Sequence, residues 1–598
     1  MKAFFSCHIF PGRIGFAVAL VCSILGLQSC AAQPANPPAS SPPASTIIPG
    51  NVLAVMKKVA DWQLVNPSAS SNRYTENEWT WGACYAGMMA LGDISDDPKY
   101  RNAMLAVGEK FTWKLAPRLY DADDHCVGQA YAELYLRYRD PKMIAPLREK
   151  FDAILAKPSS VQSLEFTAPQ SKARENWSWC DSLFMGPPVW IRLYAATSDT
   201  RYLDFMVTNW WRTTDYLYDK DEHLYFRDST YFNKREANGK KIFWSRGNGW
   251  VMGGLVRVLQ YLPNNHPDRA RFEKLFKDMS EKLLTCQQSD GLWRASLLDP
   301  ESYPLKETSG SGFYIYAFAW GVNQGLLDRA KFEPAVRTGW AALVDCVEAD
   351  GKLTHVQPVG ADPKKFANSS SDVYSVGAFL LAGSEVYKMA VLRNTVVVTG
   401  TKRGNEFISF IISSPAPLRY NATVNNPSTF RRDYETVEIK IKGSVDVPKP
   451  KLAMLDGLSS RILDSQVYSE SNFAPDKLLF QVDLAPGETR TFYILDAETL
   501  AAVPPPIVKT YARPVPERFD DFAWVSDRAA HRIFGQGVIK GEGLITSGID
   551  VWSKRTRALV IDKWYKDADY HNDHGEGMDD YRVGRSRGGG GLGIWDGK

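Results

Sequence analysis

An aspartate flanked by aromatic and apolar side chains is the first candidate for chemistry in this sequence. Asp181 follows Trp177-Ser178-Trp179-Cys180 and precedes Leu183-Phe184-Met185. In such an apolar setting the charged form of a carboxyl group is disfavoured, so its pKa rises and it can deliver a proton near neutral pH. The alternative role of Asp181 is to cap the helix that follows, and the pattern alone does not separate the two.

A second loop supplies further ionisable groups. The run Asp121-Ala122-Asp123-Asp124-His125 offers Asp124 as a second carboxylate that holds or activates a water molecule. His125 is a candidate for contact with a substrate. The alternative for the whole run is a polar turn.

A third loop carries a cation between aromatic residues. Arg246, in Trp244-Ser245-Arg246-Gly247-Asn248, can grip a carboxylate through two parallel hydrogen bonds, or it can brace the inner helices as a structural residue. Flat indole rings suit the apolar faces of sugars, although a helical core also uses them. The candidate rings are Trp179, Trp244 and Trp250, and for Trp250 a place in the core is the alternative.

These three loops precede a repeated helical element. Six segments begin with glycine and continue with small and apolar residues, starting at Gly82, Gly128, Gly186, Gly249, Gly312 and Gly377. Between them, Asp before Pro or Thr marks the starts of second helices at Asp97, Asp140 and Asp199. Helices that are apolar all round belong inside, and those with one charged face belong outside.

Six such pairs predict a closed ring, an (α/α)6 barrel, in a mainly α protein. An open solenoid of two-helix units is the alternative. In a ring, the loops before the inner helices converge on one mouth, where helix N-termini favour anions. We therefore expect Asp181, Asp124 and Arg246 to lie around one pocket.

The rest of the chain divides by composition. We predict the barrel over residues 50–392, a small β-sandwich over 393–497, a Pro-rich linker over 498–517, and a partial β-rich segment over 518–598 that reads as truncated. The alternating run Val437–Lys442 is an example of the strand pattern.

The first thirty residues predict export. Residues 1–30 read as a signal peptide whose end, Leu27-Gln28-Ser29-Cys30, resembles a bacterial lipobox with Cys30 acylated, and residues 31–49 read as a disordered tether. Simple secretion after cleavage near Ala31-Ala32 is the alternative. We expect a protein of the periplasm or the outer membrane.

Charge and cysteine content exclude other classes of function. A net charge of +3 gives no polyanion-binding face, so no nucleic acid is expected. The scattered cysteines Cys84, Cys126, Cys180, Cys286 and Cys346 indicate neither a disulfide framework nor a zinc site. We expect no cofactor and no metal, and the oligomeric state stays open.

Four motifs, in order over about residues 50–390, resemble those of glycoside hydrolase family 105, the unsaturated rhamnogalacturonyl hydrolases. They are Trp179–Pro188, Trp244–Trp250, Glu307–Gly312 and Gly377–Glu385. The resemblance implies removal of a terminal 4,5-unsaturated uronic acid from lyase-generated oligosaccharides of rhamnogalacturonan or ulvan type, by hydration of the double bond. It implies that Asp181 is the general acid/base and Asp124 the second acidic residue, with Arg246 and Trp250 contacting the uronate.

The chain departs from that family pattern at one place. Members carry a Tyr-His pair where this chain has Tyr225-Phe226-Arg227-Asp228, which makes Arg227 a further candidate for substrate contact. The stretch Phe519–Lys598 resembles the start of an uncharacterised domain often fused behind such barrels. Its His571, Asp573, His574 and Glu576 suggest metal ligands, but a polar loop is the preferred interpretation.

Two other functions fit parts of the sequence. A polysaccharide lyase on the same fold would need a Tyr, His or Lys base near a charge-neutralising group, which the Asp181 loop does not supply. A surface glycan-binding lipoprotein would use the aromatic residues without needing a buried acid.

Overall fold

The structure is a computed structural model. It describes residues 47–67, 74–167, 171–393, 396–398, 410–411, 418–442, 452–468, 477–496, 500–535, 537–541, 548–567 and 569–579. The predicted signal peptide, Cys30 and most of the predicted tether lie outside the described residues.

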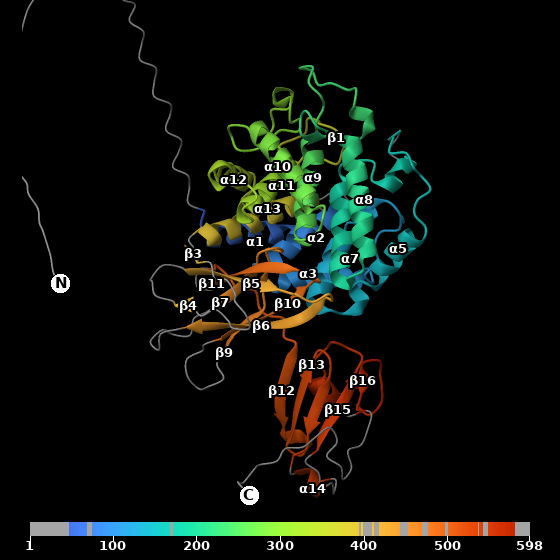
Figure 1. Ribbon diagram of the computed structural model, residues 1–598, viewed down its shortest axis with the longest axis vertical. Coiled ribbons are helices and arrows are strands. Elements are labelled where there is room, and N and C mark those ends of the chain that lie inside the picture. Colours follow the sequence, from blue (N-terminus) through green and yellow to red (C-terminus); the bar gives the residue numbers. More distant parts are fainter. Residues whose placement is uncertain are drawn as a thin grey trace, which may run out of the picture. The chain divides into compact units, whose positions relative to one another are not determined.

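Residues 49–393 form pairs of outer and inner helices (Figure 1). The outer helices are α1 (Pro49–Val65), α3 (Lys99–Lys110), α5 (Ala145–Ala156), α8 (Thr200–Leu217), α10 (Arg269–Cys286) and α12 (Arg329–Val344). The inner helices are α2 (Trp79–Gly92), α4 (Gly128–Tyr138), α7 (Pro187–Thr197), α9 (Ser245–Leu259), α11 (Thr308–Asn323) and α13 (Val373–Arg393).

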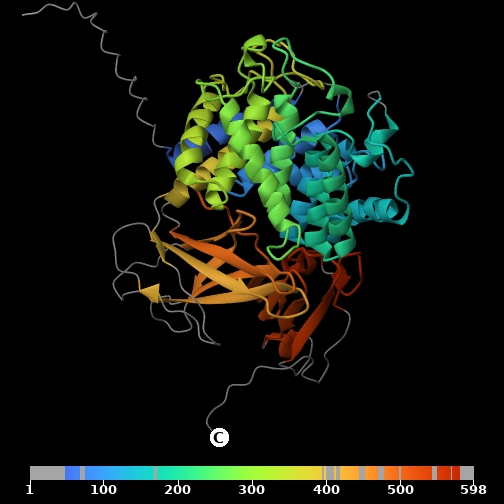
Figure 2. The same cartoon turned by 45° about the horizontal axis from the view of Figure 1, so that its top comes forward.

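The inner helices close into a ring. Each contacts the next, and α13 returns to contact α2. This closure confirms the predicted (α/α)6 barrel and excludes the open solenoid, because the ends of a solenoid do not meet. Figure 2 shows the same helices, coloured blue through yellow-green, as one continuous helical body.

Burial explains which helices lie inside. Every residue of α9 and of α11 is buried, whereas α8 and α10 alternate buried apolar residues with exposed polar ones. The last inner helix, within Val373–Leu392, is apolar and long enough to cross a bilayer, but here it is entirely buried in the barrel. Its hydrophobicity is that of a core helix.

Glycine permits the closest approaches between inner helices. A Cβ at Gly377 of α13 would lie 2.1 Å from the carbonyl oxygen of Ala83 in α2, and one at Gly254 of α9 would lie 2.2 Å from that of Leu183. Both distances are far below van der Waals contact. These positions therefore require glycine for packing.

Two sheets follow the barrel and enclose a separate apolar core. One has the order β3 (Val396–Val398), β5 (Leu418–Asn425), β11 (Thr489–Asp496), β7 (Leu452–Asp456), β8 (Ile462–Leu463). The other has the order β4 (Phe410–Ile411), β6 (Arg432–Lys442), β10 (Lys477–Leu484), β9 (Ser465–Tyr468). Leu478 and Phe480 of β10 and Phe492 of β11 meet in this core. The predicted run Val437–Lys442 is the second half of β6.

A third sheet forms the C-terminal β-rich part. Its order is β12 (Thr510–Val515), β13 (Asp521–Ser526), β14 (Ala530–Ile533), β15 (Ile549–Lys554), β16 (Gly577–Met578), with α15 (Ile561–Asp567) beside it. Strand β12 lies inside the segment predicted as a linker. It pairs with β13 from Thr510↔Ser526 to Val515↔Asp521, so part of that proline-bearing segment is sheet. Pro514 is tolerated because β12 is an edge strand.

Candidate active site

The Asp181 side chain lies in the loop before the short helix α6 (Ser182–Met185), and it is 9% exposed. It makes no capping hydrogen bond with α6, so the structural alternative considered for this residue does not apply. Burial raises the pKa of Asp181, and the nearby Arg227, Cys180 and Arg246 oppose that rise. The environment is that of an acid able to hold its proton and then release it.

Arg227 is the cation beside this acid. Its Nε lies 3.8 Å from Oδ2 of Asp181, and its Nη1 donates to Asp228 at 2.6 Å. The guanidinium also lies over the ring of Phe166, 4.9 Å from the ring centre. The residue that departs from the family pattern is thus held in place next to the proposed proton donor.

The segment carrying Arg227 is pinned to an inner helix. Asn248 of α9 accepts a hydrogen bond from Tyr225 N at 2.8 Å and donates one to Tyr225 O at 3.0 Å. The peptide nitrogen of Cys180 donates to the carbonyl of Arg227 at 2.8 Å. These bonds hold the two loops together and fix Arg227 against Asp181.

The second acidic loop forms the 3-10 turn η2 (Ala122–His125), which contacts α6. Asp124 is 2% exposed, and both of its carboxylate oxygens accept hydrogen bonds from Arg118. Its Oδ2 accepts from the backbone nitrogen of Arg118 at 2.5 Å, and its Oδ1 accepts from Nη2 of Arg118 at 2.5 Å. A carboxylate held in this way braces a loop. The role of Asp124 as the second carboxylate stays a prediction.

Its neighbour Asp123 is a further candidate for the second carboxylate, the one that holds or activates a water molecule. Asp123 accepts a hydrogen bond from Arg174 at 2.6 Å and keeps more exposure than Asp124, with 14% of its side chain accessible. Burial, together with the negative charge of Asp121, raises the pKa of Asp123 to about 7. The sequence did not distinguish the two adjacent aspartates, because the fold of the 3-10 turn decides which arginine each of them meets.

Arg174 connects the two acidic loops. Its guanidinium lies over the indole of Trp179, 4.3 Å from the ring centre, and its Nε donates to Asp121 at 2.8 Å. Trp179 is 1% exposed, so its ring is covered by this cation. In this structure Trp179 supports the site, and the predicted contact with a sugar would require Arg174 to move.

Arg246 is the second residue of α9, close enough to Asp181 for its charge to act on that carboxyl group. It donates to the carbonyls of Gln357 and Pro358 and to the hydroxyl of Tyr374, and it is packed between the rings of Trp244 and Tyr374. Its positive charge acts to lower the pKa of Asp181, against the larger effect of burial. Its buried Nε has no hydrogen-bond partner among the described residues.

Three predicted contact residues face the core. Trp250 is fully buried, with ring centres of Phe184 and Phe313 at 4.9 and 4.7 Å. His125 bonds to the carbonyl of Leu119 at 2.8 Å, and burial lowers its pKa to about 3. Trp244 is 2% exposed, with Nε1 donating to Gln357 at 3.0 Å. In this structure their polar atoms or ring faces are covered by other protein groups, and direct contact of these side chains with a substrate stays a prediction.

Two residues of the mouth were not predicted. Trp79, at the start of α2, is only partly buried and stacks on Tyr374 with ring centres 5.6 Å apart. Asp372 precedes α13, and burial raises its pKa to about 6. Trp79 is the first residue of α2 and Asp372 directly precedes α13, so the rule that pointed to the Asp181 loop applied to them too.

The four C-terminal residues considered as metal ligands have protein partners or exposed positions. His574 pairs with Asp569 at 3.0 Å, and Glu576 with Lys563 at 2.8 Å. Asp573 accepts hydrogen bonds from the backbone of Gly575 and Gly577, and His571 lies 3.3 Å from Asp579. No group of three metal-binding side chains occurs among the described residues.

Comparisons with known proteins agree with this geometry. A curated relative, the unsaturated 3S-rhamnoglycuronyl hydrolase of Formosa agariphila, is 41% identical over 56% of this chain and 90% of its own. A solved glycosyl hydrolase family 88 protein from Bacteroides vulgatus superposes with a TM-score of 0.52 at 29% identity, over 57% of this chain and all of that one. Another solved structure, titled a polysaccharide lyase, gives 0.51 at 30% identity, over 57% of this chain and 97% of that one.

Two family models match the chain. The model described as a domain of unknown function, DUF4861, matches residues 424–598, so it begins within the β-sandwich. The model of Glycosyl Hydrolase Family 88 matches residues 55–390, which are the barrel. The relationship inferred from the four motifs is thereby confirmed, and the chain belongs to glycosyl hydrolase family 88.

Proposed function

We propose that this protein is a glycosidase that removes a terminal 4,5-unsaturated uronic acid from oligosaccharides made by polysaccharide lyases. The observation that carries the proposal is the Asp181 side chain: buried, free of a capping role, and 3.8 Å from a fixed guanidinium. The name of the Formosa agariphila relative favours a uronate linked to rhamnose, as in ulvan-type oligosaccharides.

In the proposed reaction the barrel hydrates a double bond. Protonated Asp181 delivers its proton to C4 of the unsaturated ring, and water adds at C5 as Asp123 accepts the proton that the water loses. The resulting hemiketal opens by breaking the bond between C5 and the ring oxygen, which gives a ketone at C5 and a hemiacetal at C1. The hemiacetal then breaks down to an aldehyde, and the glycosidic oxygen leaves as a hydroxyl group of the remaining sugar. Arg227 and Nε of Arg246 are the donors assigned to the uronate carboxylate.

A lyase remains the second candidate, because one solved neighbour carries that title. A lyase creates the same kind of double bond that the proposed hydrolase consumes. The two activities therefore change ultraviolet absorbance in opposite directions, and one assay separates them.

The test is a panel of lyase-generated pectin and ulvan oligosaccharides, followed by the absorbance of the conjugated double bond. A fall in absorbance with one panel member supports the hydrolase and identifies its substrate. A rise with intact polymer supports the lyase. Unchanged absorbance with retained binding would reassign the protein as a glycan-binding module.

The N-terminal sequence supports a proposal on where the enzyme is located. The lipobox-like Leu27-Gln28-Ser29-Cys30 supports a lipoprotein of the periplasm or outer membrane, where lyase products enter the cell envelope.

A further inference from the structure

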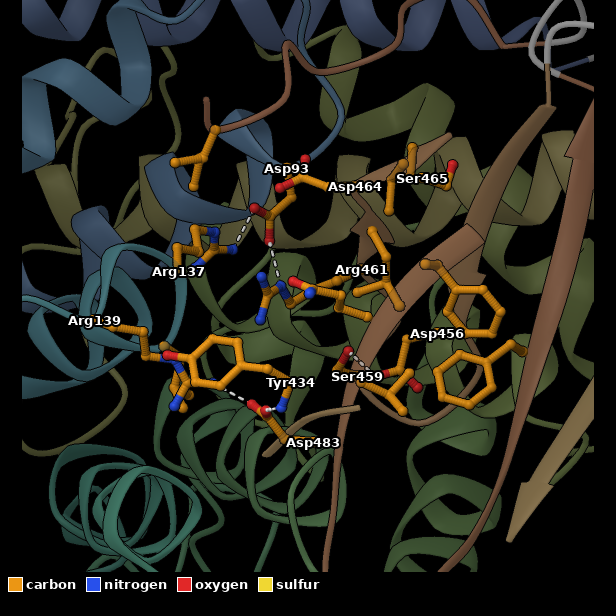
Figure 3. Close-up of a pocket in the computed structure, with 18 of the residues that line it drawn as sticks. Asp93, Arg137, Arg139, Tyr434, Asp456, Ser459, Arg461, Asp464, Ser465 and Asp483 are labelled. Atoms are coloured by element: carbon orange, nitrogen blue, oxygen red, sulfur yellow. Dashed lines mark hydrogen bonds and ion pairs between the residues drawn. The ribbon is translucent and has the colours of Figure 1, made fainter. Parts of the chain in front are cut away.

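A polar cavity lies at the end of the inner helices opposite to Asp181. Asp181 lies before helix N-termini, whereas this cavity is lined by the last residues of α2, α4 and α9, near Asp93, Arg139 and Tyr261. Its other wall comes from the β-sandwich, and its volume is about 680 Å³ (Figure 3). A cavity of this size can hold a small ligand of one or two sugar units.

Most charges in this cavity are matched. Arg139 of the barrel pairs with Asp483 of β10, Arg137 pairs with Asp93, and Arg490 of β11 pairs with Glu488 at 2.6 Å. Arginines at helix C-termini also interact favourably with the helix dipole. Of these three pairs, Arg139–Asp483 joins the sandwich to the barrel, and none of the three needs a ligand.

Two further arginines of the cavity, Arg461 and Arg101, have no close carboxylate partner of their own among the described residues. Arg461 comes from the turn between β7 and β8, and among the described residues its one ion pair within 4.0 Å is with Asp93, whose carboxylate already serves Arg137. The charges of Glu133 and Asp456 act on it from farther away. The buried Nε of Arg461 has no hydrogen-bond partner among the described residues. Figure 3 shows its side chain beside Asp93 inside the cavity.

Arg101 of α3 is the second of these two arginines. It is 7% exposed, donates to the backbone carbonyl of Pro505 at 3.0 Å, and leaves its own buried Nε without a partner within the described chain. Its side chain packs on Gly92, the residue before Asp93. Arg137 and Arg461 thus share the carboxylate of Asp93, and Arg101 lies in the same cavity wall. A second anion would stabilise the guanidinium groups that this one carboxylate serves incompletely.

We propose that this cavity binds an anionic sugar residue, carrying a carboxylate or a sulfate, with Arg461 and Arg101 as its anchors. A guanidinium binds either anion through paired hydrogen bonds. The ring of Tyr194, which also lines the cavity, offers an apolar face to a sugar. The site would hold a polyuronate chain on the enzyme away from the catalytic mouth, and it does not depend on the proposed hydrolase activity.

The test uses full-length protein and a saturated oligouronate, which has no double bond for the enzyme to consume. Calorimetric titration of the wild type should show a binding event that Arg461→Gln and Arg101→Gln each weaken by about tenfold or more. Arg555→Gln, at an arginine whose side chain is 72% exposed, serves as the matched control and should bind like the wild type. Hydrolysis of an unsaturated oligosaccharide should be unchanged in Arg461→Gln, which separates this site from the mouth.

Equal binding by the wild type and by both cavity variants would overturn the proposal. Inorganic sulfate is titrated in parallel, and if it binds as tightly as the oligouronate the site takes a small anion and the assignment to sugar is wrong. Arg461→Lys keeps the charge but loses the fork, so an intermediate affinity is expected. Thermal unfolding midpoints confirm that each variant is folded.

Discussion

At the scale of single residues, the account depends on how one cation tunes one acid. Burial and Arg227 act on the pKa of Asp181 in opposite directions, and burial is the larger effect. The chain therefore keeps a carboxyl group that is protonated more often than a surface aspartate, next to a cation that stabilises its charged form after proton transfer. The reacting form is the protonated acid, so activity should fall as pH rises through this pKa.

Replacing Arg227 tests this balance. In Arg227→Gln the opposing charge is lost, so the pKa of Asp181 should rise and the alkaline limb of the pH–rate profile should move to higher pH. The measurement is kcat/KM against pH, with the exposed Arg201→Gln as control. An alkaline limb that stays in place would show that Arg227 does not act on the acid.

The two adjacent aspartates of η2 should behave differently. Asp123→Asn should lower kcat by about a hundredfold or more if this residue handles the proton of water, with little change in stability. Asp124→Asn should instead lower the free energy of unfolding by about 1–3 kcal/mol, because the buried partner of Arg118 is lost. Urea unfolding and steady-state kinetics of both variants check this, and the reverse pattern would restore Asp124 as the second carboxylate.

At the scale of elements, the barrel is set by glycine-led helices that pack closely. The presence of the inner helices was predictable, because glycine-led apolar runs recur along the sequence. Helix α4 begins at the predicted Gly128, whereas α9, α11 and α13 each begin four residues before the predicted glycine. For the site, the sequence predicted which loops take part but not the direction of every side chain. Sequence position shows that Trp250 and His125 stand near the mouth but does not give the direction of their side chains, and both turn into the core.

Strand β12 shows a second limit of sequence reasoning. Prolines before it suggested a linker, yet its backbone pairs with β13 along one edge. Edge pairing depends on a partner strand that local composition does not reveal.

Gly377→Ala tests the closure of the ring. The added methyl group would meet the Ala83 carbonyl at 2.1 Å, so α13 and α2 must separate. We expect a loss of about 1–3 kcal/mol in the free energy of unfolding. Gly360→Ala, whose new methyl group would have its nearest neighbour at 3.7 Å, is the control. Equal stability of the two variants would contradict the closed packing.

At the scale of the whole molecule, the proposed lipoprotein leader would tether the enzyme to the cell envelope. If Cys30 is acylated, Cys30→Ser should move the protein from the membrane fraction to the soluble fraction while leaving catalysis unchanged. Fractionation followed by activity measurement checks this. A wild-type protein found only in the soluble fraction would favour simple secretion.

The most direct measurement of the central claim is the loss of double-bond absorbance by wild type and Asp181→Asn on the same unsaturated oligosaccharide. The account predicts that the wild type removes the absorbance, and that Asp181→Asn, folded and still binding, does so at least about a hundredfold more slowly. Asp221→Asn, at an exposed aspartate, should match the wild type. An Asp181→Asn variant that removes the absorbance at the wild-type rate would contradict the assignment of Asp181 as the proton donor.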